Sequence, residues 1–110
     1  MGTELELLTG SIRYIGMELS RKSEEDFTIE SMHYEILDRD RNIIDSGSDS
    51  DAYGIIDGNM VFYVMDTTKV DGSGNLLFEV GKVYTVCYSV HILGMVKIIK
   101  SSRKIKITRC

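Results

Sequence analysis

The chain has 110 residues, of which 43% are hydrophobic and 27% charged, with a formal net charge of -4. This length suits one domain and is short for two. The apolar share is too high for a disordered chain, and charged residues interrupt it too often for a membrane span. An acidic total also argues against a general nucleic-acid binder. We therefore expect a single globular domain over residues 1–110 that crosses no membrane.

The net charge hides a strong asymmetry along the chain. Residues 1–79 contain six Lys/Arg and all 17 Asp/Glu, a net charge of -11, whereas residues 80–110 contain seven Lys/Arg and no acid, a net charge of +7. Opposite charges on two surfaces steer docking and fix its register. The asymmetry therefore predicts contact between an acidic face of one molecule and a basic final segment of another. Alternatively, the basic final strand could pair with acidic neighbours in its own sheet, which would neutralise these charges without a partner molecule.

The first residues show no basic segment, no apolar stretch of leader length and no cleavage pattern, and the chain has two cysteines. We therefore expect synthesis in a cytoplasm, with both thiols free. Residues 3–8 and 11–15 alternate around Gly10, which predicts one strand with a bend or bulge. Residues 1–8 could also act as an N-terminal arm that adds a strand to a neighbouring subunit.

The next segments switch between strand patterns and turn signals. Residues 17–26 are polar and predict a loop. Residues 27–37 alternate, with a change of phase that predicts a bulge near Ser31. Beyond them we expect a hairpin turn at 38–42, a short strand at 42–45, a solvated loop at 46–51, a strand at 52–56 and a turn at 57–59.

Six apolar residues in a row, Met60 to Met65, predict a strand that is buried on both faces. In a two-layer sandwich the outer face of a strand normally meets water, so an apolar outer face indicates that something covers it. Met60, Phe62 and Val64 are therefore candidate interface residues. The alternative is an outer face with scattered exposed apolar side chains, which is common in soluble proteins.

The last third of the chain contains the longest predicted strand. Residues 83–93 alternate, and we expect one side of that strand to enter the core: Tyr84, Val86, Tyr88, Val90 and Ile92. Residues 95–99 and 103–108 predict two more strands, separated by Ser101 and Ser102, with Ile105 and Ile107 inward. In total we expect seven to nine short strands and no helix, which is typical of an all-β, antiparallel sandwich or barrel.

The segment from Phe78 to Val86 resembles the corner that enters the sixth strand of fibronectin type III and related immunoglobulin-like domains. In that family an apolar residue precedes a tyrosine by six positions and a glycine precedes it by three, as Phe78 and Gly81 precede Tyr84. Gly81 would permit the turn, and the Tyr84 hydroxyl would bond the backbone upstream. The cysteine pair of true immunoglobulin domains is not matched. The resemblance implies an antiparallel immunoglobulin-like sandwich.

The order of features along the whole chain is similar to that of small immunoglobulin-like structural proteins of tailed phages. These features are the acidic first half, Gly58-Asn59 before an apolar strand that ends at Asp66-Thr67-Thr68, and the basic final strand. The similarity implies a virion component made in the host cytoplasm: a head decoration, a head-fibre base, or a neck or tail accessory protein. It implies a multi-subunit assembly with copies of itself or a larger shell or neck protein, with no catalysis and no cofactor.

Basic side chains concentrate in the last strands and form the second set of candidate interface residues: Lys97, Lys100, Arg103, Lys104 and Lys106. A stripe of this kind can contact phosphates, but the aromatic residues of a stacking platform are missing, so we do not expect nucleic acid. Two interpretations remain. The stripe contacts another protein, or its lysines protect an edge strand from pairing with another edge.

No arrangement typical of an active site or a metal site stands out. Asp45, Asp49, Asp51 and Asp57 could supply oxygen ligands to calcium, but they match the EF-hand spacing only in part. His33 and His91 have no clustered ligands around them, so we expect no metal. Phosphate loops and nucleophile motifs are absent from the sequence. We therefore expect neither catalytic nor cofactor-binding residues.

These observations predict a non-enzymatic structural protein that acts by protein–protein assembly. One alternative is a carbohydrate- or cell-surface-binding module, although the chain has no tryptophan and only Tyr53 in a predicted loop. The other alternative is a small regulator in a bacterial cytoplasm that binds a partner enzyme. The position of the protein in a virion, the partner and the symmetry all stay open at this point.

Overall fold

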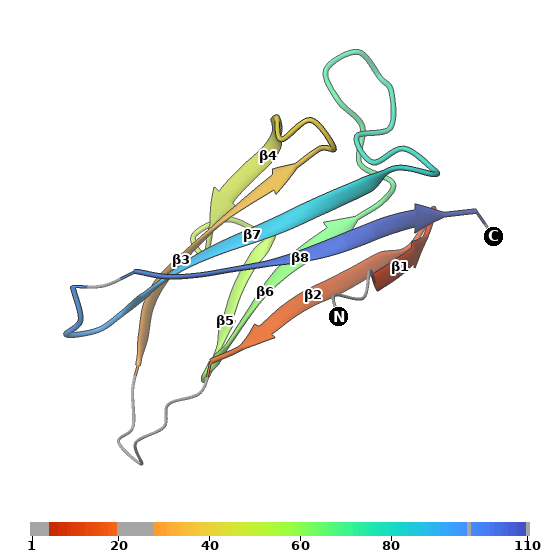
Figure 1. Cartoon of the computed structure of the whole chain (residues 1–110). Helices are drawn as coiled ribbons and strands as arrows, with labels where there is room; N and C mark the ends of the chain where they lie inside the picture. Colours follow the sequence, from red (N-terminus) through yellow and green to blue (C-terminus); the bar gives the residue numbers. More distant parts are fainter. Residues whose placement is uncertain (1–4, 20–27, 97, 110) are drawn as a thin grey trace.

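The structure is a computed structural model that describes residues 5–19, 28–96 and 98–109. Within them it contains eight strands and no helix, so the all-β prediction is confirmed (Figure 1). The strands are β1 (Leu5–Leu8), β2 (Ile12–Glu18), β3 (Ile29–Leu37), β4 (Ile43–Ser48), β5 (Gly54–Asp57), β6 (Met60–Asp66), β7 (Val83–Ile92) and β8 (Ile98–Thr108). Cys110 and Lys97 lie outside the described residues.

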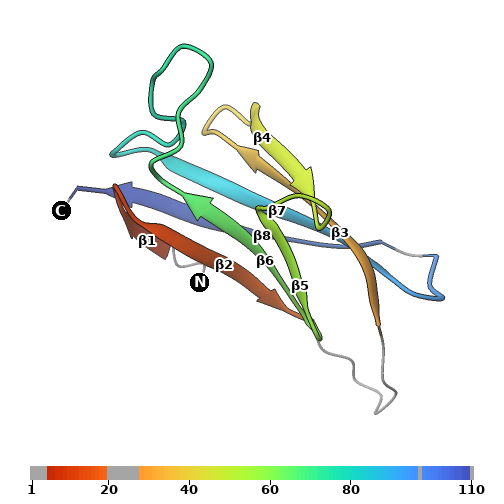
Figure 2. The same ribbon diagram turned by 180° about the vertical axis from the view of Figure 1, so that it is seen from behind.

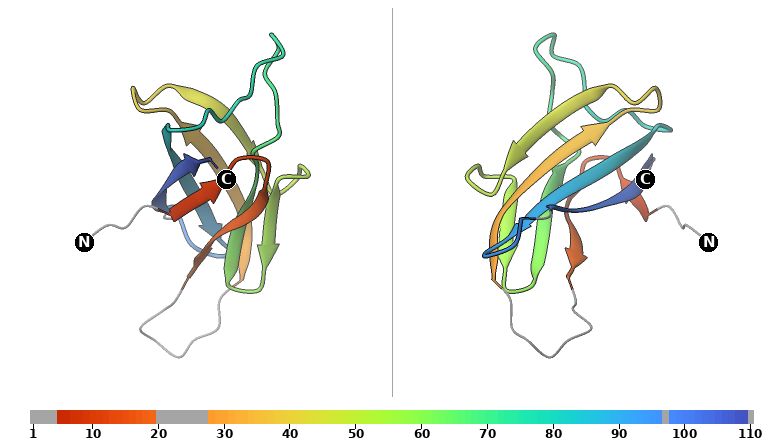
Figure 3. Two further views of the ribbon diagram at one scale, coloured as in Figure 1. Left: turned by 90° about the vertical axis from the view of Figure 1, so that its right-hand side faces the viewer. Right: turned by 60° about the vertical axis from the view of Figure 1, so that its left-hand side comes forward.

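The strands form two sheets that lie in two layers (Figures 1 and 3). The five-stranded sheet has the order β1-β8-β7-β3-β4, and the three-stranded sheet has the order β2-β6-β5. All neighbours are antiparallel except β1, which pairs in parallel with β8. Viewed from behind, the three-stranded sheet lies in front of β7 and β8 (Figure 2).

One hydrophobic core lies between the two sheets. Buried and partly exposed residues alternate strictly along β7, and Tyr84, Val86, Tyr88, Val90 and Ile92 are all buried. The inward set predicted for this strand is therefore confirmed. The three-stranded sheet contributes Ile15, Val61, Tyr63 and Met65 to the same core cluster, and β8 contributes Ile105 and Ile107 as predicted. Burial of these side chains is the main stabilising contribution to the fold.

Two local predictions in the β3–β4 region are confirmed. The register of β3 against β7 shifts between Ile29 and Ser31, which is the predicted bulge. The hairpin turn at 38–42 is closed by the Asp38 amide, which donates to the Asn42 carbonyl at 2.9 Å. The Asp38 carboxylate accepts hydrogen bonds from the amides of Asp40 and Asn42 inside this turn. Such side-chain caps are the ordinary way in which aspartate stabilises a turn.

Several strand limits predicted from the sequence are wrong. Residues 5–8 and 12–18 are not one bent strand, because β1 and β2 belong to different sheets and Gly10, with φ of 85°, reverses the chain between them. Residues 17 and 18 continue β2, and residues 46–48 continue β4, where loops were predicted. Ser101 and Ser102 do not interrupt β8, which pairs with β7 from Ile98 onward.

The predicted N-terminal arm is part of this chain's own sheet over its described residues. Leu5 to Leu8 pair with Ile105 to Thr108, and the Leu7 side chain is fully buried. Residues 1–4 lie outside the described part. Residues 5–8 are therefore not a free arm: they form the edge strand of the five-stranded sheet, paired on one side only within the described chain, and strand addition to a neighbouring subunit stays a prediction.

Candidate functional site

The apolar run of β6 is buried on one face only. Val61, Tyr63 and Met65 enter the core, whereas Met60, Phe62 and Val64 point to the other side of the three-stranded sheet and are partly exposed. The prediction of a strand buried on both faces is therefore wrong within the described chain. The physical reason is that this sheet has a second layer on one side only.

The outer face of the three-stranded sheet is nevertheless apolar across all three strands. We call it the apolar face and define it by residues that share this side of the sheet: Ile12 and Tyr14 of β2, Ile55 of β5, and Met60, Phe62 and Val64 of β6. The register places Tyr14 beside Val64. Tyr14 is 62% exposed and Ile12 is 58% exposed. A contiguous apolar surface of this kind marks a contact site more often than isolated exposed residues do.

Gly16 of β2 pairs with Phe62 on this face. The ring of Phe62 occupies the space that a side chain at position 16 would need. A Cβ atom at Gly16 would lie 2.5 Å from Cε1 of Phe62. The Tyr14 ring flanks Phe62, with centroids 6.1 Å apart and planes tilted by 57°. The two rings therefore form a fixed aromatic pair, of which Tyr14 is the more exposed member.

Acidic residues border the apolar face at both ends. Glu18 and Asp57 both pair with Met60 at one end, and Asp66 pairs with Ile12 at the other. Hydrogen bonds from the side chain and amide of Thr68 lower the pKa of Asp66, so this carboxylate stays ionised. An apolar centre with a charged rim is the usual anatomy of a protein–protein contact.

The basic candidates lie on β8, in the other sheet. Lys100, Lys104 and Lys106 alternate along the strand and point away from the core, opposite Ser89, Thr85 and Val83 of β7. In the described part of the chain, none of these three lysines forms an ion pair. We call this side of the five-stranded sheet the basic face; Glu6, opposite Lys106, and Glu35, opposite Cys87, also lie on it. It lies on the opposite side of the sandwich from the apolar face.

Arg103 is separate from this set. It has the same strand phase as the core residues Ile105 and Ile107, and its guanidinium donates to the Gly16 carbonyl of β2 at 3.2 Å. It therefore bridges the two sheets where the sandwich opens. Grouping Arg103 with the lysines is wrong, because successive side chains of a strand point to opposite faces.

The edge-strand interpretation of β8 applies to only part of that strand. β1 pairs with residues 105–108, so Lys106 lies between two paired neighbours. Residues 98–104 pair with β7 on one side and have no strand of the described chain on the other side. Lys100 and Lys104 lie in this part of β8. Charged side chains at such a position discourage pairing with another edge.

The predicted corner residues come together between the two sheets. Phe78 is fully buried, and its ring meets the Tyr84 ring edge-on with centroids 5.3 Å apart. The Glu79 amide donates to the Tyr84 hydroxyl at 2.7 Å. Gly81 turns the chain with φ of 85°, a conformation that L side chains avoid. Phe78 and Tyr84 are buried, so these two side chains have a structural role.

The acidic residues proposed as calcium ligands are occupied by internal hydrogen bonds. Asp49 accepts from the Met32 amide at 3.1 Å, and Asp45 accepts from the Tyr63 hydroxyl at 3.1 Å and from Lys69 at 3.0 Å. Asp57 lies apart from them, at the end of β5. Over the described ranges, no group of three or more His, Cys, Asp or Glu side chains could hold a metal ion.

Asp51 has the densest set of contacts. Its carboxylate accepts from the amides of Ser48 and Tyr53 and from the Tyr34 hydroxyl. Desolvation is the largest single effect and opposes ionisation, but these hydrogen bonds together outweigh it and lower the pKa of Asp51. Burial and the hydrogen bond to Asp51 in turn raise the pKa of Tyr34.

Replacing Asp51 by asparagine should therefore reduce stability and flatten its response to acid. A depressed carboxyl pKa stabilises the fold above the ordinary value of 3.8, and this contribution is lost as the pH falls through the lowered value. Melting temperatures of the two proteins should differ most near about pH 6, and the difference should shrink as the pH falls below 3.8 through the lowered pKa of Asp51. A difference that stays equal as the pH falls would contradict this role of the Asp51 charge.

His33, His91 and Cys87 have no arrangement suited to catalysis. His91 lies 3.3 Å from the Glu30 carboxylate, and its other ring nitrogen lies 2.8 Å from the Met95 carbonyl. His33 points out from the centre of the basic face. Burial, followed by the Glu35 charge, raises the pKa of Cys87, so this thiol is a poor nucleophile at neutral pH.

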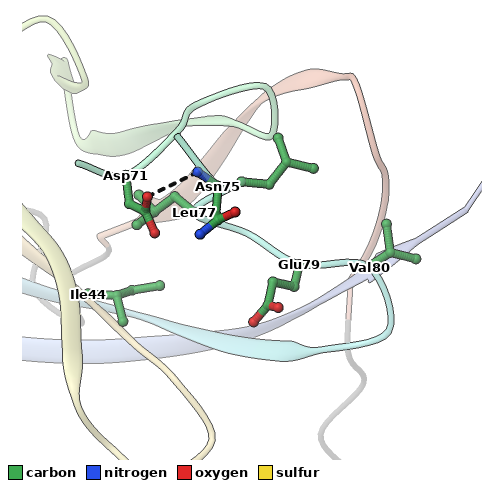
Figure 4. A pocket seen from close by; sticks show the side chains of 7 residues that line it. Ile44, Asp71, Asn75, Leu77, Glu79 and Val80 are labelled. Atoms are coloured by element: carbon green, nitrogen blue, oxygen red, sulfur yellow. Dashed lines mark hydrogen bonds between the residues drawn. The ribbon is translucent and has the colours of Figure 1, made fainter. Parts of the chain in front are cut away.

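A separate hollow of about 570 Å³ lies beneath the loop after β6 (Figure 4). Ile44, Leu77 and Val80 contribute apolar surface to it, and Asp71, Asn75 and Glu79 contribute polar groups. The Asp71 carboxylate already accepts from the amides of Ser73 and Asn75. This hollow is therefore mainly the inner side of a loop that Asp71 organises.

Comparison of the chain with protein-family models, with curated proteins and with solved structures found no match in any of the three. The described part of the chain contains no helix that could span a membrane. Function must therefore be argued from the surfaces themselves.

Sequence reasoning did not find Ile12 and Tyr14 as part of this surface. The signal was present, because apolar residues occupy both phases of the strand: Ile12 and Tyr14 in one, and Ile15 and Met17 in the other. Tyr53, the aromatic residue predicted to be in a loop, is not free, since the Lys69 ammonium lies 4.2 Å from its ring centroid.

Proposed function

We propose that this chain is a non-enzymatic structural protein that assembles head to tail with copies of itself. One observation carries the proposal: an apolar face with an acidic rim lies on one side of the sandwich, and three lysines without ion pairs lie on the other. Contact between unlike faces is heterologous, and it builds rings or filaments rather than a closed dimer.

The alternative of two apolar faces meeting each other is less favourable. Such a contact would bring the Glu18, Asp57 and Asp66 carboxylates of both copies together, and like charges across an interface cost free energy. The basic face instead offers Leu37, Val83 and the aliphatic stems of its lysines to the apolar face, with ammonium groups placed to meet the rim.

The fold that we propose for this role is an immunoglobulin-like sandwich. The order β8-β7-β3-β4 corresponds to strands G, F, C and C′ of that fold, and β2-β6-β5 corresponds to B, E and D. The bond between the Glu79 amide and the Tyr84 hydroxyl is the kind of contact expected at its tyrosine corner.

The setting that we propose is the virion of a tailed phage, as a head decoration, a head-fibre base, or a neck or tail accessory protein. The support for this setting is the sequence resemblance alone. Assembly with a larger shell or neck protein and partner binding in a bacterial cytoplasm use the same two faces.

Charge reversal on each face tests the head-to-tail contact. Lys104→Glu/Lys106→Glu alone and Glu18→Lys/Asp57→Lys alone should each weaken self-association by roughly tenfold or more at low salt, because close charge pairs couple strongly. An equimolar mixture of the two variants should recover association. Sedimentation velocity measures both effects, with circular dichroism to verify the fold. Association that neither variant changes, a mixture that does not recover, or a monomeric wild-type chain would refute the proposal.

A second function, glycan binding, is favoured by one observation. Tyr14 is an exposed aromatic ring on a sheet face, with Glu18 four positions along the same strand and Asp66 nearby in β6. Sugars stack on such rings and bond such carboxylates. A glycan array with no binding by the wild-type protein would remove this candidate.

A further inference from the structure

Four cationic side chains converge at the corner where the β3–β4 turn meets the start of β7. Arg39, Lys82 and Lys104 line a pocket of about 390 Å³, and an adjoining pocket of about 230 Å³ is lined by Arg39, Arg41 and Lys104. Leu37, Val83 and Thr85 supply the floor. The four cations come from three separate segments, so the fold and not local sequence gathers them.

These charges are not neutralised within the described chain. No carboxylate lies within ion-pair distance of any of the four cations there. Asp38 also lines the smaller pocket, but its carboxylate accepts bonds from the Asp40 and Asn42 amides and the Asn42 side chain. The lining therefore presents four positive groups against one carboxylate that is already occupied.

The backbone that carries these side chains is fixed before any ligand binds. The Arg41 amide donates to the Asp38 carbonyl at 3.0 Å. Lys82 is held on both sides, because its amide donates to the Glu79 carbonyl at 3.2 Å and its carbonyl accepts from the Ile107 amide at 3.1 Å. A backbone that is already ordered pays less conformational entropy on binding than a flexible one does.

Arg41 has φ of 67° and is the only non-glycine residue with positive φ among the described residues. Asparagine and glycine adopt this left-handed region more readily than arginine does. Strained residues of this kind cluster at binding sites, where the side chain is needed in spite of the backbone cost. The residue type at position 41 therefore points to a role for the guanidinium.

We propose that this corner, the cationic pocket of Arg39, Arg41, Lys82 and Lys104, binds a tetrahedral oxyanion of the phosphate type. Two guanidinium groups can each offer paired N–H donors to such a group, and two ammonium groups add point charges. A dianion or a longer phosphate chain matches four cations better than a single carboxylate does. The pocket shares Leu37, Val83 and Lys104 with the basic face, so its binding is measured on the monomeric chain.

Isothermal titration with pyrophosphate at low salt tests the pocket, at protein concentrations where the chain is monomeric. Arg41→Asn should weaken pyrophosphate binding by roughly tenfold, because it removes one bidentate donor, while its melting temperature stays equal or rises as the backbone conformation becomes easier. Lys100→Gln is the matched control, since Lys100 lies on the same strand and face as Lys104 but outside both pockets. It should change the affinity by less than about threefold.

A tetrahedral oxyanion can come from a phosphate group or from a sulfate ester, and a titration with sulfate distinguishes the two. A site for sulfate esters should prefer sulfate to phosphate. Citrate tests the class of ligand, because it carries carboxylates only and should bind more weakly than pyrophosphate. No heat with pyrophosphate, equal weakening by Arg41→Asn and Lys100→Gln, or citrate binding as tight as pyrophosphate would each overturn the proposal. Loss of pyrophosphate binding with self-association intact leaves the assembly function unaffected, so the two proposals fail separately.

Discussion

Replacing Phe78 by alanine should lower the free energy of unfolding by about 3–5 kcal/mol. The Phe78 side chain is fully buried, and its ring packs edge-on against Tyr84 at 5.3 Å between centroids. The substitution removes apolar burial and leaves a cavity at the point where the chain crosses between the sheets. For a domain of this length, a loss of this size is a large part of the total stability.

Tyr84→Phe is the matched control for this experiment. It keeps the ring that packs on Phe78 and removes only the hydroxyl that accepts from the Glu79 amide. A net hydrogen bond contributes about 1 kcal/mol, and an amide without a partner costs somewhat more. Urea unfolding followed by circular dichroism gives both values. A loss for Phe78→Ala no greater than that for Tyr84→Phe would contradict the view that packing, not the hydrogen bond, dominates the corner.

The corner and the central strand could be predicted from the sequence because their signals are local. Alternation over ten residues fixes the inward face of β7, since a one-residue slip would expose every core side chain of that strand. The Phe78, Gly81 and Tyr84 spacing is also local: the Phe78 and Tyr84 rings meet across six positions, and Gly81 turns the chain between them.

The separation of β1 from β2 and the continuity of β8 depend on partners far away in the sequence. Gly10 shows where the chain turns, but only the pairing of β1 with β8 decides which sheet receives residues 5–8. Ser101 reads as a break because polar residues normally end an apolar strand. In the structure this part of β8 is exposed on both faces. Backbone pairing with β7, rather than burial of side chains, therefore keeps it in the sheet.

The candidate faces were predictable by strand and only partly by residue. The alternation of β6 placed Met60, Phe62 and Val64 on one side, but the neighbours that extend this side into a surface come from β2 and β5. The cationic pocket could not be predicted, because Arg39, Lys82 and Lys104 are distant in sequence. Only the register of β3, β7 and β8 brings them together.

Replacing Tyr14 by serine should weaken self-association by roughly 30-fold or more, since an aromatic anchor of an interface contributes about 2 kcal/mol or more. Tyr14 is 62% exposed, so the change removes little burial within the chain, and the melting temperature should stay nearly constant. Its ring stands beside Phe62 of β6, the middle strand of the three-stranded sheet, and a docked partner would exclude water from both rings.

Leu93→Ser is the control for this variant, because Leu93 is 61% exposed and lies in the turn after β7, outside both the apolar face and the basic face. It removes a similar exposed apolar side chain without touching the proposed contact, so its association should match that of the wild type. Equal weakening by Tyr14→Ser and Leu93→Ser would mean that association follows general surface hydrophobicity. Weakening by Tyr14→Ser alone, at unchanged stability, would place the contact on the apolar face, because charge steers the encounter while the desolvated rings hold the complex.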